Sequence, residues 1–327
     1  MNYRPLGRTG LTVSEIGFGG GNVGGLMVRG TPDVQRHAVA RALELGITYF
    51  DTAPSYGDGR SEENLGRVLQ ELGARVTLGT KYRVGPEEVA QAREVIRASV
   101  TTSLGRLRRS HLDLLQLHNN VCLETGGRPV ALGVEQVLGP LLEALRSLRA
   151  EGLVRFFGFT GLGETAAAHR LVESGAFDTV QVYFNALNPS AGYAVSPGPG
   201  VQDFERLIDR AEAQGMGVLN IRAVAAGALG AEEERHPLAS PNPGAALSTG
   251  AEYGGDLQRA RALQPLAREL GMESVTELAL RFALAKPGIS TVLVGFSDVA
   301  QIEAAARWAE QGPLGENGVS RVLAAGA

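Results

Sequence analysis

Apolar runs typical of buried strands alternate with segments of helical periodicity along nearly the whole chain, and this alternation constrains the fold more than any other feature. The runs that fit strands lie at residues 15–18, 48–51, 76–80, 112–117, 156–159, 179–184, 217–221 and 291–294. The helical segments lie at residues 32–45, 61–72, 86–107, 134–151, 164–174, 203–214, 255–270, 274–285 and 298–309. Eight strand–helix units in 327 residues predict an α/β protein with a (β/α)8 TIM barrel and inserted loops.

The whole chain, residues 1–327, is expected to form a single domain, because no repeat or change of composition marks a linker. Residues 3–13, turned at residues 7–10, predict an N-terminal β-hairpin. Residues 223–254 are rich in Gly, Pro and Ala and are too long for a compact connection, so we expect a lid, a binding loop or disorder there. Helix start signals are found at Thr31, at Ser61 and in the possible capping box of Ser274 with Glu277.

Composition narrows the functional class. A net charge of -4 gives no electrostatic reason to bind nucleic acid. Cys122 is the only cysteine, which favours a reducing compartment and excludes an intrachain disulfide. No stretch approaches the roughly twenty apolar residues of a membrane span, and the N-terminus has no signal-peptide pattern. A soluble, cytoplasmic protein is expected, with its oligomeric state open.

A glycine-rich motif offers a competing fold. Residues 19–24, GGGNVG, match the dinucleotide fingerprint G-x-G-x-x-G after a strand. In a doubly wound fold the last glycine already belongs to the helix that holds the pyrophosphate, whereas Gly25, Gly30 and Pro32 delay any helix here. The match is therefore a weak one, and the barrel is favoured.

Four polar residues, Asp51, Tyr56, Lys81 and His118, lie at or just beyond the ends of three apolar runs. In a barrel these strand ends meet at one face, where catalytic groups gather. The chain contains only one other lysine, Lys286, and uses arginine elsewhere. Lys81 therefore indicates chemistry that needs a compact ammonium able to shift the pKa of a neighbour or its own. Each residue alone has an ordinary structural role open to it, but the four together favour a site.

The constellation suits reduction of a carbonyl, which needs a hydride on carbon and a proton on oxygen. Tyr56 is a weak acid alone, and an adjacent Lys81 ammonium would stabilise its phenolate. Asp51 would supply the counter-charge for a buried Lys81, and His118 would orient the substrate oxygen or relay the proton. A Schiff-base aldolase that uses Lys81 as its nucleophile fits the same residues and stays open.

These residues also carry a family resemblance. The segment FDTAPSYG at residues 50–57, with Thr80-Lys81 and Leu117-His118-Asn119 further on, resembles the signature blocks of the aldo-keto reductase family. The resemblance implies a (β/α)8 barrel that binds NADPH or NADH without a Rossmann fold, with no metal. It implies that Asp51, Tyr56, Lys81 and His118 form the catalytic tetrad, with Tyr56 as general acid and base.

The resemblance also implies cofactor positions, which match less closely. Thr160 stands where the family commonly has serine, Gln181 matches a carboxamide-binding glutamine, and Asp298 would repel a 2′-phosphate. NADP is expected on family habit, with NAD possible. The implied cofactor-binding residues are Gly20, Thr160, Gln181, Ile221, Arg222, Val224, Gly227, Gly295, Ser297 and Gln301.

The substrate is implied only as a class. Thr160-Gly161-Leu162 is similar to the branch of the family that contains aldose dehydrogenases of the L-galactose dehydrogenase type, and Asn119 could bind a hydroxylated ligand. The expected partner is thus a small carbonyl compound or sugar, with no nucleic acid and no membrane. A regulatory subunit that resembles potassium-channel β-subunits, and binds nicotinamide without turnover, is a second alternative.

Overall fold

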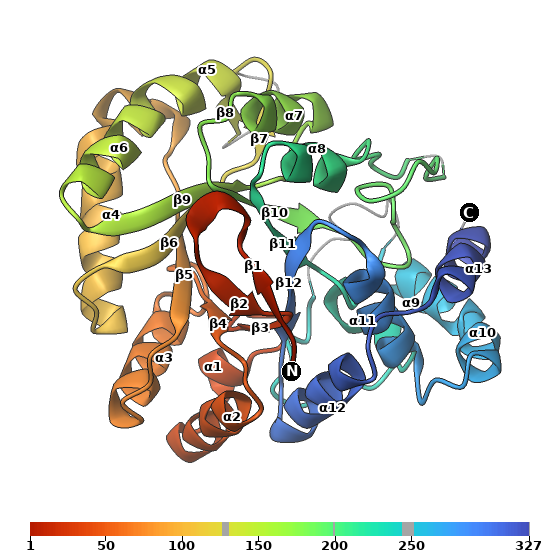
Figure 1. Ribbon diagram of the computed structural model, residues 1–327. Coiled ribbons are helices and arrows are strands. Elements are labelled where there is room, and N and C mark those ends of the chain that lie inside the picture. Colours follow the sequence, from red (N-terminus) through yellow and green to blue (C-terminus); the bar gives the residue numbers. More distant parts are fainter. Residues whose placement is uncertain (126–130, 199, 244–251, 327) are drawn as a thin grey trace.

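Eight parallel strands close into a barrel in the computed structural model, which describes residues 1–125, 131–198, 200–243 and 252–326. The last strand pairs with the first, so the barrel has no open edge (Figure 1). The predicted barrel is confirmed, and every predicted strand is present within a few residues. The strands in chain order are β3 (Ile16–Gly19), β4 (Tyr49–Asp51), β5 (Thr77–Tyr82), β6 (Leu112–Leu117), β9 (Val154–Thr160), β10 (Thr179–Tyr183), β11 (Gly217–Ile221) and β12 (Ile289–Gly295).

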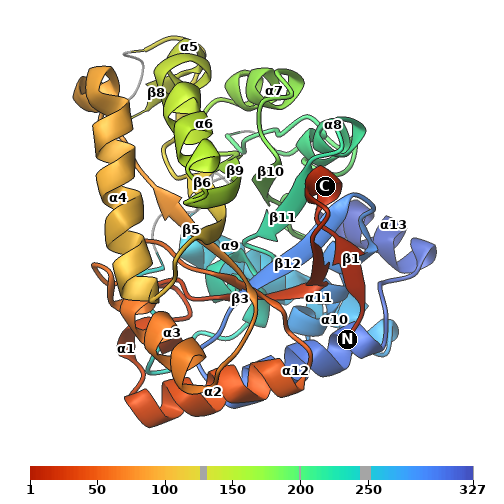
Figure 2. The same cartoon turned by 60° about the vertical axis from the view of Figure 1, so that its left-hand side comes forward.

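Helices surround the barrel, and their apolar faces pack against its outer side (Figures 1 and 2). Thr31 caps α2 by accepting a hydrogen bond from the backbone N–H of Val34 at 3.4 Å. Ser274 caps α11 in the same way, by accepting from the N–H of Glu277 at 3.1 Å. The α-helices are α1 (Leu26–Arg29), α2 (Pro32–Glu44), α3 (Arg60–Glu71), α4 (Ala92–Leu107), α5 (Val134–Gln136), α6 (Leu142–Ala150), α7 (Thr165–Glu173), α8 (Leu207–Ala213), α9 (Tyr253–Ala262), α10 (Gln264–Glu269), α11 (Val275–Ala285), α12 (Val299–Glu310) and α13 (Glu316–Gly326).

Several predicted helices differ from the structure for identifiable reasons. The segment 134–151 is interrupted by a π-helical turn, η3 (Val137–Leu141), because Gly139 is not helical and Pro140 has no N–H to donate. The segment 86–107 begins with a 3₁₀ helix, η2 (Pro86–Gln91), before α4. The helix predicted from residue 203 begins only at Leu207, because Glu205 and Arg206 have positive φ.

The N-terminal hairpin closes one end of the barrel. Strands β1 (Tyr3–Pro5) and β2 (Thr12–Ser14) pair antiparallel and are joined through η1 (Gly7–Thr9), which confirms the predicted hairpin. Figure 1 shows this hairpin lying across the barrel. Its buried side chains form one cluster with inward-facing residues of four barrel strands, namely Leu6, Val13, Tyr49, Leu114, Leu219 and Leu293. The N-terminal end of the barrel is thus filled, and access is left at the carboxyl ends of the strands.

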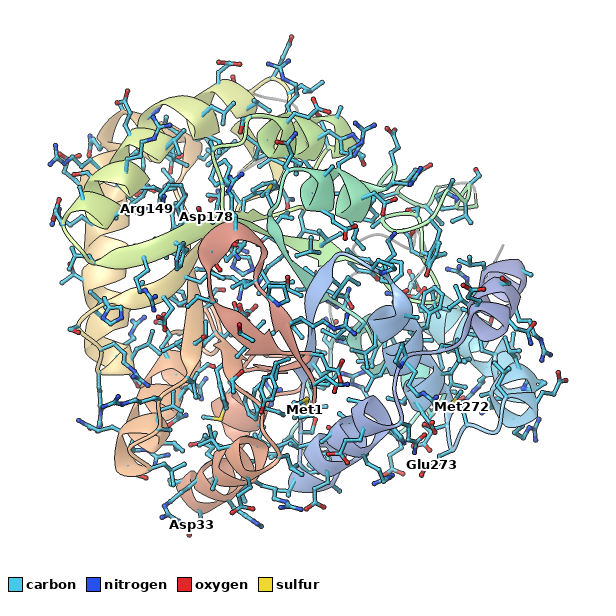
Figure 3. All side chains as sticks on the ribbon, viewed as in Figure 1. Met1, Asp33, Arg149, Asp178, Met272 and Glu273 are labelled. Carbon is cyan, nitrogen blue, oxygen red and sulfur yellow. The ribbon has the colours of Figure 1, made fainter. Side chains whose placement is uncertain are left out.

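Contacts on the outer side of the barrel hold helices to the strands, and Arg149 with Asp178, both labelled in Figure 3, is an example. Arg149 on α6 forms an ion pair with Asp178, and its guanidinium lies 3.9 Å from the centre of the Phe157 ring. Asp178 also accepts a hydrogen bond from the backbone N–H of Phe157 at 2.9 Å. This contact therefore holds α6 against β9, the next strand in the chain.

The long segment after β11, for which the sequence left a lid, a binding loop or disorder open, has defined structure over residues 223–243. A 3₁₀ helix, η4 (Ala225–Gly230), follows the strand, and Arg235 donates hydrogen bonds to Ala226 O at 3.0 Å and to the Tyr253 hydroxyl at 2.7 Å. Ser240 N donates to Val23 O at 2.9 Å, which ties the segment to the loop after β3. The remainder of the prediction falls on residues 244–251, which lie outside the described residues.

The closed barrel also decides against the doubly wound alternative. Gly24 does not open a phosphate-binding helix of the required length, because α1 ends at Arg29. Instead it packs against β12, where a Cβ atom on Gly24 would lie 2.6 Å from the backbone of Gly295. Two short strands, β7 (Val121–Cys122) and β8 (Leu132–Gly133), were not predicted. Among the described residues, no helix has the length and apolar character to cross a membrane.

Candidate active site

The four polar residues predicted to form a site come from adjacent strands. Asp51 ends β4, Tyr56 lies in the loop that follows, and His118 comes directly after β6. Lys81 lies inside β5, one residue before its end, whereas the predicted strand ended at residue 80 and placed Lys81 at or just beyond the strand end. Because β4, β5 and β6 are neighbours in the barrel, these side chains meet at the open end.

Asp51 and Lys81 form a buried ion pair. Lys81 Nζ donates to Asp51 Oδ1 and, at 2.9 Å, to the backbone carbonyl of Thr52. Only 2% of Lys81 and 4% of Asp51 is exposed. Burial lowers the pKa of Lys81, but the Asp51 carboxylate and Tyr56 outweigh it and the net shift is upward. Lys81 therefore carries its positive charge at neutral pH.

Tyr56 lies between the charged pair and His118. Lys81 Nζ is 4.8 Å from the centre of the Tyr56 ring, and the ring meets that of His118 edge-on with the centres 6.0 Å apart. Burial, Lys81 and Arg83 lower the pKa of His118 to about 2, so its imidazole is neutral at physiological pH. Tyr56 and His118 are both half-buried, so a ligand at the open end can reach them.

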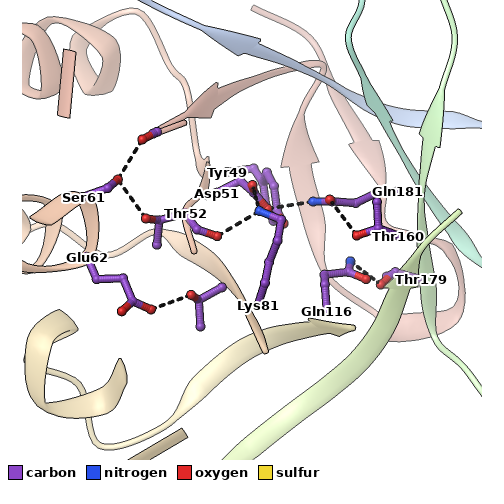
Figure 4. A network of polar contacts seen from close by, with 12 residues as sticks. Tyr49, Asp51, Thr52, Ser61, Glu62, Lys81, Gln116, Thr160, Thr179 and Gln181 are labelled. Carbon is purple, nitrogen blue, oxygen red and sulfur yellow. Dashed lines mark hydrogen bonds and ion pairs between the residues drawn. The ribbon is translucent and has the colours of Figure 1, made fainter. Parts of the chain in front are cut away.

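The carboxylate of Asp51 has two further donors deeper in the barrel (Figure 4). Gln181 Nε2 donates to Asp51 Oδ2 at 2.8 Å, and the Tyr49 hydroxyl donates to the same oxygen at 3.4 Å. Thr160 Oγ1 lies 3.5 Å from Gln181 Oε1 and completes a chain across the barrel. Sequence reasoning missed Tyr49, although its spacing of two from Asp51 places both side chains on one face of β4.

A second group of contacts fixes the loop after β4. Thr52 Oγ1 donates to Ser61 Oγ at 2.8 Å, and Ser61 Oγ donates to Gly20 O at 2.8 Å (Figure 4). Ser61 was predicted to start a helix, but α3 begins at Arg60 and the Ser61 hydroxyl serves this contact instead. Gly20 needs to be small, because a Cβ atom there would lie 2.7 Å from Ser61 Oγ.

The residues predicted to bind a dinucleotide lie at the same end of the barrel as the four polar residues. Thr160, Ile221 and Gly295 end β9, β11 and β12, and Gly20 follows β3. The predicted positions farther along the chain, Val224 and Gly227, lie in the segment after β11.

The guanidinium of Arg222 tests whether this end of the barrel fits a cofactor that carries phosphates. Its φ of 61° is unusual for a residue with a side chain, and its carbonyl accepts a hydrogen bond from Asn185 Nδ2 at 2.9 Å. The guanidinium is partly exposed and has no hydrogen bond or ion pair with any other residue that the structure describes. A guanidinium with no partner in the described part of the chain, beside the barrel opening, fits the anionic phosphates of a dinucleotide.

Two other groups of predicted ligands are engaged within the protein. Ser297 Oγ donates to Gly24 O at 2.7 Å, and Gln301 Oε1 accepts from Ser297 N at 2.8 Å. The Asp298 carboxylate caps α12 and lies 3.5 Å from His236. The Asn119 amide bonds to both backbone groups of Val84, at 3.1 and 2.8 Å, so it fastens the loops beside the site.

Closed barrel, buried ion pair and neighbouring phenol together place titratable side chains at the carboxyl ends of the strands of a (β/α)8 barrel, the end at which enzymes of this fold carry their active sites. Residues 15–326 match the family model described as Aldo/keto reductase family, and the chain belongs to this family. Members of the family are generally NAD(P)H-dependent oxidoreductases that act on carbonyl compounds.

Individual proteins extend the comparison. The chain is 31% identical over 310 residues to L-galactose dehydrogenase of Arabidopsis thaliana, an alignment that covers 93% of this chain and 86% of that protein. It is 24% identical to a probable voltage-gated potassium channel subunit beta of the same plant, over 93% and 89% of the two chains. The fold resembles that of the aldo-keto reductase AKR11C1 from Bacillus halodurans in its holo form, with a TM-score of 0.72, 23% identity and 99% and 96% coverage.

Proposed function

We propose that the protein interconverts a carbonyl and an alcohol on a small aldehyde or aldose, with a nicotinamide dinucleotide as hydride donor or acceptor and Tyr56 as general acid and base. The observation that carries this proposal is the buried Lys81–Asp51 ion pair beside Tyr56 at the open end of the barrel. An ammonium at this position can stabilise the negative charge that develops on the Tyr56 oxygen as its proton is transferred.

The side chains have distinct roles in the reduction. A nicotinamide bound at this end of the barrel would supply the hydride that adds to the carbonyl carbon. Tyr56 donates its proton to the carbonyl oxygen, and Lys81 stabilises the phenolate that remains. Neutral His118 donates an N–H hydrogen bond that orients the substrate oxygen. In the reverse direction, the Tyr56 phenolate takes the proton of the alcohol as the hydride leaves.

The dinucleotide would lie along the carboxyl ends of the strands. Arg222 would bind its phosphates, and Thr160 and Gln181 would bind the carboxamide of the nicotinamide ring. The other proposed contacts are Gly20, Ile221, Val224, Gly227, Gly295, Ser297 and Gln301. NADP is the expected cofactor. NAD is the alternative, because the Asp298 carboxylate at the start of α12 would repel the additional phosphate that NADP carries.

The substrate class rests on similarity and on the polar character of the site. The name of L-galactose dehydrogenase, which is 31% identical to this chain, gives a sugar as the substrate of that protein. We extend that class to this chain as an aldose or small aldehyde, with Asn119 as a proposed contact to substrate hydroxyls. The Schiff-base aldolase is disfavoured, because Lys81 is protonated, ion-paired and bonded to the Thr52 carbonyl.

The test compares wild type with Tyr56→Phe in assays of NADPH or NADH oxidation with short aldehydes and of NADP⁺ or NAD⁺ reduction with aldoses. Tyr82→Phe is the matched control, since Tyr82 is a buried phenol on β5 whose hydroxyl has no hydrogen-bond partner among the described residues. Turnover in wild type and Tyr82→Phe, with its loss in Tyr56→Phe, supports the proposal. Dinucleotide binding without turnover of any carbonyl would favour a regulatory subunit instead.

A further inference from the structure

Below the ion pair, a tyrosine that is fully buried within the barrel reaches toward the site. Tyr49 has no exposed surface and belongs to the apolar cluster under the N-terminal hairpin. Its hydroxyl is nevertheless directed at Asp51 Oδ2, at 3.4 Å. Burial and the Asp51 carboxylate raise the pKa of Tyr49 well above its ordinary value, so this phenol stays protonated and donates its hydrogen to the carboxylate.

Two glycines on the flanking strands provide the space that this phenol occupies. A Cβ atom on Gly79 of β5 would lie only 2.3 Å from the Tyr49 hydroxyl oxygen, and one on Gly17 of β3 would lie 3.2 Å from Tyr49 Cδ1. Both positions face the barrel interior beside β4. The interior is therefore shaped to admit a phenol at residue 49 and to place its hydroxyl under Asp51.

The result is a carboxylate held from three strands. Lys81 of β5 binds Oδ1, whereas Gln181 of β10 and Tyr49 of β4 donate to Oδ2. With Oδ2 occupied by Gln181 and Tyr49, Oδ1 is directed at the Lys81 ammonium. Figure 4 shows Lys81, Gln181 and Tyr49 gathered around Asp51. A rotation of the carboxylate would break contacts to Gln181 and Tyr49 at the same time.

We propose that Tyr49, in the space left by Gly79, is a positioning residue that fixes the orientation and charge of Asp51 and, through Asp51, the place of Lys81 beside Tyr56. The effect on turnover rests on the function proposed above. A buried phenol in this barrel does not always have a hydrogen-bond partner, because the hydroxyl of the buried Tyr82 has none among the described residues. The Tyr49 hydroxyl is thus distinguished by what it contacts.

The test removes one hydroxyl at a time, with Tyr49→Phe as the variant and Tyr82→Phe as its matched control. Tyr49→Phe should lower the melting temperature by no more than about 3 °C and keep dinucleotide affinity, but lose roughly 3–10-fold in kcat, as expected for one long hydrogen bond to a carboxylate. Loss of a donor also raises the pKa of Asp51, so the acid limb of the kcat–pH profile should move up by about half a pH unit. Tyr82→Phe should change neither quantity. A Tyr49→Phe profile that coincides with wild type, or equal changes in both variants, would overturn the proposal.

A second variant tests the role of Gly79. The added methyl group of Gly79→Ala would displace the Tyr49 hydroxyl, so this substitution should reduce kcat in the wild-type background. Phe at residue 49 removes the oxygen at 2.3 Å and leaves the added methyl group with ring Cζ at 3.2 Å and Asp51 Oδ2 at 3.4 Å, so Gly79→Ala should cost less in the Tyr49→Phe background. Losses that simply multiply would contradict the proposed coupling.

A readout independent of turnover separates this inference from the proposed function. The chain has two lysines, so an NMR spectrum of ¹⁵N-lysine-labelled protein contains two side-chain ammonium signals, which Lys286→Met assigns. Tyr49→Phe should shift the Lys81 signal and leave that of Lys286 in place. If wild type turns over no carbonyl, the proposed function fails, but a shifted Lys81 signal still supports the positioning role. An unchanged Lys81 signal would overturn the positioning role itself.

Discussion

Replacing Lys81 by methionine tests how much the buried ion pair contributes to stability. The substitution keeps the length of the side chain but removes the charge. It leaves the Asp51 carboxylate, of which only 4% is exposed to solvent, without its counter-charge. Breaking a buried pair by removing one partner typically costs about 3–5 kcal/mol. Gln181 at 2.8 Å remains as a donor to Asp51, so we expect the lower end, about 3 kcal/mol, at neutral pH.

The sign of the pH dependence follows from burial. Without Lys81, burial raises the pKa of Asp51 further above its ordinary value. A carboxyl group whose pKa is higher in the folded than in the unfolded state destabilises the folded state increasingly as the pH rises from the ordinary pKa to the raised one. It costs little at a pH low enough to protonate it in both states. The stability lost in Lys81→Met should therefore shrink as the pH falls from neutral toward about 4.

The assay is urea unfolding followed by circular dichroism and by the fluorescence of Trp308, at several pH values. The double variant Asp51→Asn/Lys81→Met removes both charges, so it should lose at least about 2 kcal/mol less than the sum of the two single losses. Losses of unfolding free energy that simply add in the double variant, or a loss in Lys81→Met that stays constant with pH, would refute the view that the buried Lys81–Asp51 ion pair stabilises the fold.

Three further predictions concern the site and its surroundings. Lys286→Met breaks the ion pair between the buried Lys286 and the partly exposed Asp209, and should cost about 1–3 kcal/mol in urea unfolding while kcat stays at the wild-type value; a large fall in kcat would contradict the assignment of the site. The His118 ring signals in NMR should not titrate between about pH 8 and 5, because the folded-state pKa lies near 2, and a midpoint within that window would be the contrary result. Arg222→Gln should weaken dinucleotide binding by roughly tenfold in calorimetry without changing the melting temperature of the free protein, and unaltered affinity would remove Arg222 from the cofactor site.

The fold was accessible from the sequence because its strands are short apolar runs with clear boundaries. Residues 112–117 and 217–221 were predicted with the same bounds that β6 and β11 have in the structure. Helix interruptions were less accessible: the kink at Gly139-Pro140 follows from residue types, whereas the positive φ of Arg206 depends on tertiary contacts.

The candidate site shows a similar division. Sequence position was sufficient to group Asp51, Lys81 and His118, since parallel strands bring their carboxyl ends together. The contact of Gln181 with Asp51 crosses the barrel from β10 to β4, a relation that strand order alone does not provide. The fit of Tyr49 against Gly79 depends on the register between β4 and β5, so it became visible only in three dimensions.

The central claim is tested most directly by a single-turnover experiment in which wild type and Tyr56→Phe are each saturated with NADPH, or with NADH, and mixed with an aldehyde. Nicotinamide fluorescence measures binding, and its absorbance measures hydride transfer. We predict that both proteins bind the same dinucleotide and that only wild type oxidises it at a substantial rate. Equal oxidation by both proteins would contradict Tyr56 as the proton donor, and no binding of either dinucleotide by wild type would contradict the proposed function as a whole.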